Sequence, residues 1–115
     1  MAKARVDFDT VRKIGLGMPD VEETTTYGSP ALKVGGRLLA CIPINKSAEP
    51  GSLMVRVDFA RRAELLAESP DVYYLTDHYE NYPSVLVRLA RIHPDALRDL
   101  LGMAWKFVTA KKRAI

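Results

Sequence analysis

The chain has 115 residues, of which 48% are hydrophobic and 27% are charged, with a formal net charge of +3 at pH 7. This is typical of one globular domain with its own core, and no apolar run approaches the about 20 residues that span a membrane. The single cysteine excludes an internal disulfide and a thiolate metal cluster, and no apolar leader segment follows the basic start. We therefore expect one domain over residues 1–115, in the cytoplasm and without a membrane partner.

The basic excess is concentrated at the two ends of the chain. Residues 106–115 contain Lys106, Lys111, Lys112 and Arg113 and no acid, and residues 1–13 contain four basic and two acidic residues. Residues 14–105 contain nine basic and twelve acidic residues. A domain that binds DNA through its body usually displays a basic stripe there, so the slightly acidic body weakens the case for nucleic-acid binding. Those ends form a single patch if they meet in space.

A helix and a short strand are predicted before residue 28. Asp7 is suited to cap a helix that runs to about Gly17, with Pro19 just beyond its end. The β-branched threonines within residues 22–27 then predict a first strand.

A β-hairpin is predicted around Gly35-Gly36, between strands at 31–34 and 37–44. Glycine permits the positive φ angles that two-residue type I′ or II′ turns need. The turn places Val34 opposite Arg37. By the same count, it places Leu32 opposite Leu39. One face then carries Leu32, Val34, Arg37, Leu39 and Cys41, and the other carries Lys33, Leu38, Ala40, Ile42 and Ile44. Both faces are fairly apolar, so we expect this strand to be covered at least in part on both sides.

The second half of the chain predicts a strand, a helix, a short strand, a strand and a helix. Residues 52–58 alternate between apolar and polar side chains, and Asp58 is suited to cap a helix over 60–68. An aromatic loop or short strand follows at 71–83, then a strand at 84–91 and a helix from Pro94 to about Lys111. The predicted core stripe of this last helix consists of Leu97, Leu100, Leu101, Ala104 and Val108. The order α-β-β-β-β-α-β-β-α lacks the alternation of a doubly wound parallel sheet. We therefore predict an α+β two-layer sandwich, with an antiparallel sheet and helices on one face.

Three blocks of sequence resemble those of one family of small bacterial domains. They are the hairpin Tyr27–Arg37, the strand Tyr82–Leu89 and the helical segments Ala96–Leu101 and Ala104–Val108. Over about residues 7–112 the chain resembles the MmcQ/YjbR-like family, although it lacks a tryptophan that many members carry in the strand block. The resemblance implies a fold similar to type III secretion chaperones, a sandwich with a curved antiparallel sheet. Members are commonly labelled DNA-binding, a label that implies no established site or enzymatic activity.

The first candidate site is a basic face of the sheet. Arg56 and Arg88 occupy the polar sides of their strands, and Arg37 stands at the hairpin tip. Arginine forks bind phosphate or carboxylate groups through two parallel hydrogen bonds. The alternative is that these arginines form ordinary surface ion pairs with Asp58, Glu22 or Glu23 on neighbouring strands.

The second candidate is the aromatic segment 73–83, where a ligand pocket would contain Tyr74, His78, Tyr79 and Tyr82. Aromatic rings beside basic groups can stack nucleobases, and Asp77, His78 and Glu80 could serve in acid–base chemistry. The alternative is a loop whose rings cover the sheet edge while their hydroxyls stay in water.

The third candidate is the basic C-terminus, comprising Lys106, Lys111, Lys112 and Arg113. Cations there can contact phosphates, which positions a protein on DNA without reading its sequence. The alternative is that they complement the dipole of the last helix and continue as a solvated tail.

No catalytic, metal or cofactor motif accompanies these candidates. His78 and His93 lack metal-ligand spacing, Cys41 is expected to be an inert buried thiol, and Ser29 is not in a nucleophile elbow. The sequence therefore favours a non-enzymatic domain that contacts DNA phosphates with little sequence preference. The alternative is a protein-interaction domain, chaperone-like or self-associating, with Trp105 or Phe107 as an exposed anchor.

Overall fold

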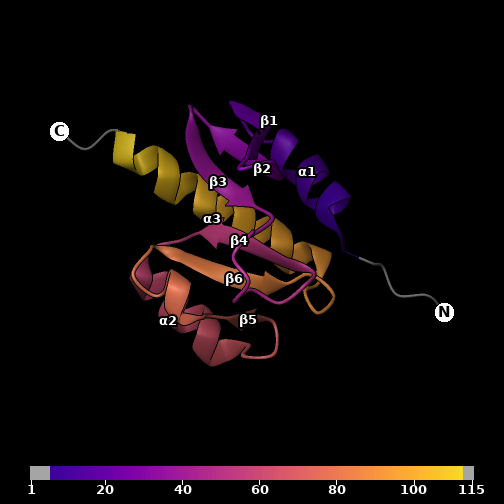
Figure 1. The fold of residues 1–115 in the computed structure, drawn as a ribbon. Coiled ribbons are helices and arrows are strands. Elements are labelled where there is room, and N and C mark those ends of the chain that lie inside the picture. The colour runs from indigo at the N-terminus through magenta and orange to yellow at the C-terminus, as the bar shows by residue number, and fades with distance from the viewer. Residues whose placement is uncertain (1–5, 113–115) are drawn as a thin grey trace.

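The computed structural model describes residues 6–112, which form one antiparallel six-stranded sheet with helices on one face (Figure 1). The strand order is β1-β2-β3-β4-β6-β5, and every neighbouring pair is antiparallel. The predicted sandwich and order of elements are confirmed, with a short 3-10 helix, η1, added before β6. The elements are α1 (Phe8–Leu16), β1 (Val21–Thr26), β2 (Ser29–Val34), β3 (Arg37–Cys41), β4 (Ser52–Arg56), α2 (Phe59–Glu68), β5 (Tyr73–Tyr74), η1 (Asp77–Tyr79), β6 (Ser84–Arg88) and α3 (Pro94–Lys112).

The helices begin where the sequence places their caps. The carboxylate of Asp7 accepts a hydrogen bond from the backbone N–H of Thr10 at 3.1 Å. The carboxylate of Asp58 accepts one from Arg61 N–H at 2.7 Å. Each bond satisfies one of the N–H groups that the first turn of a helix leaves without an intrahelical partner.

The main core lies between the sheet and the helices. α3 crosses behind β2, β3 and β4 in Figure 1, and α1 packs against α3 and β1. The predicted apolar stripe of α3 is confirmed, since all of its members are at most 2% exposed: Leu97, Leu100, Leu101, Ala104 and Val108. They meet buried side chains from the inner face of the sheet, among them Leu32, Leu39, Leu53, Val55, Val85 and Val87.

The register of the hairpin corrects one prediction. Val34 does lie opposite Arg37, but Leu32 lies opposite Ala40 rather than Leu39. The register shifts between Leu32 and Lys33, so β3 carries one extra residue, and both Leu39 and Ala40 join the main core. Because side chains alternate with a period of two, this shift moves Cys41 to the opposite face from the one predicted.

The face of the sheet away from the helices, here called the outer face, has a second apolar cluster. Its buried members are Ala31, Cys41, Met54 and Leu86, and its partly buried members are Leu38, Ala48, Tyr74 and Tyr79. Within the described chain, none of the three α-helices covers these residues. Their cover comes instead from the loop after β3 and from the aromatic segment between β5 and β6. The expectation that both faces of the central strands are covered, at least in part, is confirmed.

The close approach of α1 to the sheet yields a stability prediction. A Cβ atom on Gly15 would overlap a methyl group of Leu32, which is fully buried, whereas a Cβ on Gly102 in α3 would meet no atom within 4 Å. Alanine favours a helix over glycine by about 1 kcal/mol, but overpacking costs about 1–3 kcal/mol. Gly15→Ala should therefore lower the free energy of unfolding in urea by up to about 2 kcal/mol.

Gly102→Ala is the matched control and should raise stability by up to about 1 kcal/mol. A Gly15→Ala protein as stable as the control would contradict the described seating of α1 against β2.

Candidate functional site

The two strand arginines lie at opposite ends of the β4–β6 pair. In the antiparallel register, Arg88 lies opposite Ser52 and Arg56 lies opposite Ser84. The two arginines are thus four residue steps apart along the strand pair, which corresponds to about 13 Å. The basic sheet face predicted from Arg37, Arg56 and Arg88 is therefore divided between two ends of the sheet.

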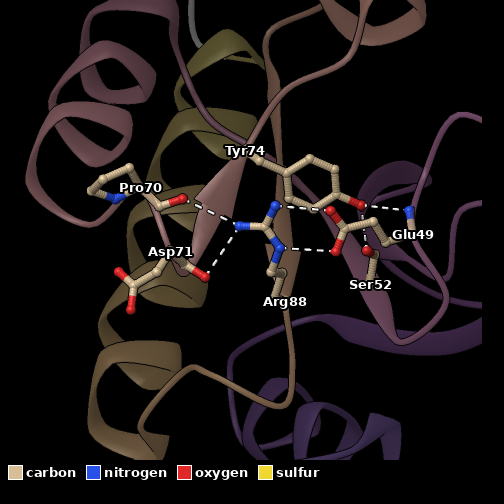
Figure 2. Close-up of polar contacts among 6 residues, drawn as sticks. All are labelled: Glu49, Ser52, Pro70, Asp71, Tyr74 and Arg88. Atoms are coloured by element: carbon tan, nitrogen blue, oxygen red, sulfur yellow. Dashed lines mark hydrogen bonds and ion pairs between the residues drawn. The ribbon is translucent and has the colours of Figure 1, made fainter.

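Arg88 is held in a clamp of polar groups (Figure 2). Its Nε and Nη2 donate to the two carboxylate oxygens of Glu49 at 2.9 and 2.8 Å. Its Nη1 donates to the carbonyls of Pro70 and Asp71 at 3.2 and 3.1 Å. The guanidinium also lies 4.4 Å from the centroid of the Tyr74 ring. The hydrogen bond between the side chains raises the pKa of Arg88 and lowers that of Glu49.

The Tyr74 hydroxyl completes this clamp. It accepts a hydrogen bond from the backbone N–H of Glu49 at 2.7 Å and lies 2.5 Å from the hydroxyl of buried Ser52 (Figure 2). Arg88 thus pairs with Glu49, and not with the acids Asp58, Glu22 or Glu23 that the sequence analysis considered. These contacts give Arg88 and Tyr74 a structural role, since they fasten the loop after β3 and the turn before β5 to the sheet.

Arg56 and Arg37 lie close together at the other end of the sheet. Arg56 Nε donates to the Pro83 carbonyl at 3.3 Å, and its guanidinium carbon lies 5.9 Å from the centroid of the Phe107 ring in α3. Burial lowers the pKa of Arg56, and the positive charge of Arg37 lowers it further. Among the described residues, no ion pair involves either arginine.

The C-terminal half of α3 reaches the same end of the molecule. Trp105 and Thr109 share the lining of a hollow with Val34 and Gly35, next to the hairpin turn that precedes Arg37. Lys106 is exposed on this part of the helix. We call Arg37, Arg56 and Lys106 the basic end. Asp20 and Glu22 also line that hollow, from the β1 side, so the positive charge is confined to the β3–β4 side.

The remaining terminal candidates are only partly placed. Lys111 and Lys112 are the last residues of α3, and Arg113 lies outside the described residues. At the other end of the chain, Arg12 and Lys13 in α1 pair with Asp9. The start of α1 and the end of α3 lie on opposite sides of Figure 1.

The aromatic segment forms one wall of a groove on the outer face. The groove consists of a hollow of about 670 Å³ and an adjoining one of about 220 Å³, which share Leu38, His78, Tyr79 and Tyr82. The first is also lined by Thr26, Tyr27 and residues 41–46, and the second by Met54, Arg56, Pro83 and Ser84. We call this surface the outer-face groove. It brings together His78, Tyr79 and Tyr82 as predicted, and Tyr74 is not in its lining.

Exposed rings and an exposed isoleucine border the groove. The His78 and Tyr79 ring centroids are 4.7 Å apart in an edge-to-face arrangement, and those of His78 and Tyr82 are 6.3 Å apart. Tyr82 and Ile44 are each 58% exposed, and Tyr27 is 88% exposed. Large apolar groups held in water next to a hollow are typical of a binding surface.

Arg62 in α2 fixes the aromatic wall of the groove, formed by His78, Tyr79 and Tyr82, and it was not among the residues predicted from the sequence. Its guanidinium donates to the carbonyls of Tyr82 at 2.9 Å and Glu80 at 3.0 Å, and at longer range to those of Tyr79 and Ser84. The available signal was its place near the start of a helix, where the helix dipole disfavours a cation.

The interface anchors expected on α3 are not exposed. Trp105 and Phe107 are both partly buried and pack against the main core, and Trp105 Nε1 donates to the Pro19 carbonyl at 2.9 Å. Large side chains are instead exposed around the outer-face groove, at Tyr27, Ile44 and Tyr82.

The lining of the groove provides aromatic rings for stacking and the cations Lys46 and Arg56.

The thiol of Cys41, also in the lining, is not activated. Burial raises the pKa of the Cys41 thiol to about 11, so it is protonated at neutral pH and unsuited to nucleophilic attack. Within residues 6–112, no three His, Cys, Asp or Glu side chains are grouped as they would be around a metal ion. In the same part of the chain, no helix is long and apolar enough to cross a membrane.

A family model described as YjbR matches residues 16–107. The chain belongs to the YjbR family. Uncharacterized proteins Rv2570 of Mycobacterium tuberculosis and Mb2600 of Mycobacterium bovis are each 35% identical to this YjbR domain, over 91% of its length and 90% of theirs. The family resemblance found in the sequence is therefore confirmed.

A solved structure shares the fold. The crystal structure of Deinococcus radiodurans protein DR2400 superposes on this YjbR domain with a TM-score of 0.77, at 24% identity. The match covers 97% of this chain and 85% of that one.

The clamp predicts that Tyr74→Phe lowers stability without weakening ligand binding. The substitution removes the hydroxyl that pairs with buried Ser52, and a buried polar group left unpaired costs about 1–3 kcal/mol. Urea unfolding should show a loss of that size, while affinity for any ligand of the groove stays within twofold of wild type. A Tyr74→Phe protein with normal stability and impaired binding would instead place Tyr74 in the ligand site.

Proposed function

We propose that this YjbR domain is a non-enzymatic binding module that contacts nucleic-acid phosphates through its basic end. The observation that carries the proposal is the proximity of Arg37, at the start of β3, to Arg56, at the end of the neighbouring strand β4. Burial lowers the pKa of Arg56, and the positive charge of Arg37 lowers it further. Groups whose pKa is shifted by burial together with a specific nearby charge are more frequent at functional sites than elsewhere. An anion between the two arginines relieves the repulsion.

The geometry of the two arginines favours phosphate as that anion. Arg56 is half-buried, and its Nε donates a hydrogen bond to the Pro83 carbonyl. Arg37 is exposed beside it. A planar guanidinium fork hydrogen-bonds phosphate oxygens in pairs, which a lysine cannot do. Contacts of this kind fix a protein on the nucleic-acid backbone without reading sequence.

Arg88 does not contribute to this interface. Its charge is matched by Glu49, and its donors point to Glu49 and to two carbonyls. The proposed interface therefore runs from Arg37 and Arg56 toward Lys106 and the lysines that end α3. Cations at a helix C-terminus also stabilise the helix, so Lys111 and Lys112 can serve both roles.

A protein-interaction module is the second candidate. The exposed Tyr27, Ile44 and Tyr82 around the outer-face groove favour it, because aromatic side chains are frequent anchors at protein interfaces. A stable dimer in light scattering, combined with no affinity for nucleic acid, would favour this candidate over the first.

Fluorescence anisotropy of a labelled mixed-sequence DNA, titrated at several salt concentrations, tests the proposal. Binding should weaken steeply with salt, because each phosphate contact releases counterions. The double variant Arg37→Gln/Arg56→Gln should bind more weakly on all sequences, with the slope of log K against log salt shallower by about 2.

Arg61→Gln is the matched control, since Arg61 is exposed on α2 and pairs with Glu64; it should leave the slope unchanged. Absence of binding at low salt, or a double variant that behaves like the control, would refute the phosphate-binding role.

A further inference from the structure

The charged residues that line the outer-face groove are all basic. Lys46 and Arg56 belong to its lining, and none of the lining residues described above is acidic. Most of the other lining residues are apolar or aromatic, and the uncharged polar ones are Thr26, Asn45 and Ser84. The groove thus matches a ligand that combines a flat or apolar body with negative charge.

A buried hydroxyl without a partner lies in the lining next to Arg56. Ser84 is 1% exposed, and among the described residues its Oγ has no hydrogen-bond partner. Buried polar groups are nearly always paired, so an unpaired one in the lining of a hollow points to a ligand group that pairs with it.

Arg56 connects the groove to the basic end. It lines the smaller hollow together with Ser84, His78 and Tyr82. Arg37 lies close enough for its positive charge to add to the effect of burial in lowering the pKa of Arg56. A ligand whose flat part lies against the aromatic wall therefore has its anionic part within reach of both arginines.

We propose that the outer-face groove takes an unpaired base of a single-stranded nucleic acid, whose phosphate lies on Arg56 and Arg37. The base stacks on the ring cluster of His78, Tyr79 and Tyr82, and the unpartnered Ser84 hydroxyl lies in the same lining. This inference rests on the proposed phosphate-binding function and adds the form of nucleic acid that is preferred. A duplex keeps the faces of its bases stacked on one another, so it cannot offer a base face to the ring cluster.

The position of the groove disfavours a peptide that would bind by adding a strand to the sheet. Leu38, Met54 and Ser84 come from β3, β4 and β6, which are neighbours in the middle of the sheet. Peptides that add a strand need a free sheet edge with unpaired backbone groups. Here recognition falls to rings and cations, which is the combination that binds single strands with little sequence preference.

The test compares a labelled oligothymidine with a duplex of the same length and label, at equal salt, by fluorescence anisotropy. The wild-type protein should bind the single strand at least tenfold more tightly. Tyr82→Ala should weaken single-strand binding about tenfold and leave duplex binding unchanged, because it removes an exposed stacking ring. Leu16→Ala, an equally simple truncation of an exposed side chain on α1, is the control and should change neither affinity.

Ser84→Ala supplies a second measurement that does not depend on Tyr82. Without nucleic acid, the variant should melt at a higher temperature than wild type, because an unpartnered buried hydroxyl has been removed. It should also bind oligothymidine more weakly. A higher Tm with unchanged affinity would overturn the assignment of Ser84 to the ligand site.

The outcomes separate the two proposals. Equal binding of single strand and duplex, both sensitive to Arg37→Gln/Arg56→Gln, would overturn base insertion and leave phosphate binding standing. No binding of either nucleic acid would refute both. A third outcome is that oligothymidine does not bind, whereas an acidic peptide such as poly-glutamate binds the wild type but not Tyr82→Ala. This result would overturn the proposal and assign the groove to an acidic peptide.

Discussion

Two guanidinium groups hold the irregular cover of the outer face, and the candidate binding surface depends on them. Carbonyl groups in the segments before and after β5 lie outside the strand pairing of the sheet, so they need other donors. Arg62 donates to the carbonyls of Tyr82 and Glu80, and Arg88 donates to those of Pro70 and Asp71. Arginine suits this task because its five donors lie in one rigid plane. Without Arg62, the aromatic wall of the groove would lose its attachment to α2.

The parts of the fold that sequence could predict are those set by local chemistry. Helix caps at Asp7 and Asp58, the Gly35-Gly36 turn and the apolar stripe of α3 each depend on residues a few positions apart. The bulge in β3 was not predictable in this way, because it arises from fitting both Leu39 and Ala40 into the core beneath Leu32. That one extra residue is enough to turn Cys41 to the outer face.

The candidate site, too, was predictable from the sequence only where it depends on neighbouring residues. The aromatic segment was found from its composition, and the structure brings His78, Tyr79 and Tyr82 into one wall. The fate of the arginines could not be read from the sequence, because Arg88 meets Glu49 across 39 residues and Arg62 meets the Tyr82 carbonyl across 20. Of the strand arginines considered, only those without a carboxylate partner, Arg37 and Arg56, remain candidates for binding an external anion.

In the proposed complex, the basic end and the outer-face groove act as one continuous binding surface joined at Arg56. An amide chemical-shift titration of the wild-type protein with single-stranded oligothymidine tests this most directly. The largest shifts should fall on Arg37, Leu38 and Arg56, on residues 78–84 and on the C-terminal half of α3, while the amides of α1 stay unchanged. Shifts confined to residues 111–115, or spread over α1 and β1, would contradict the account.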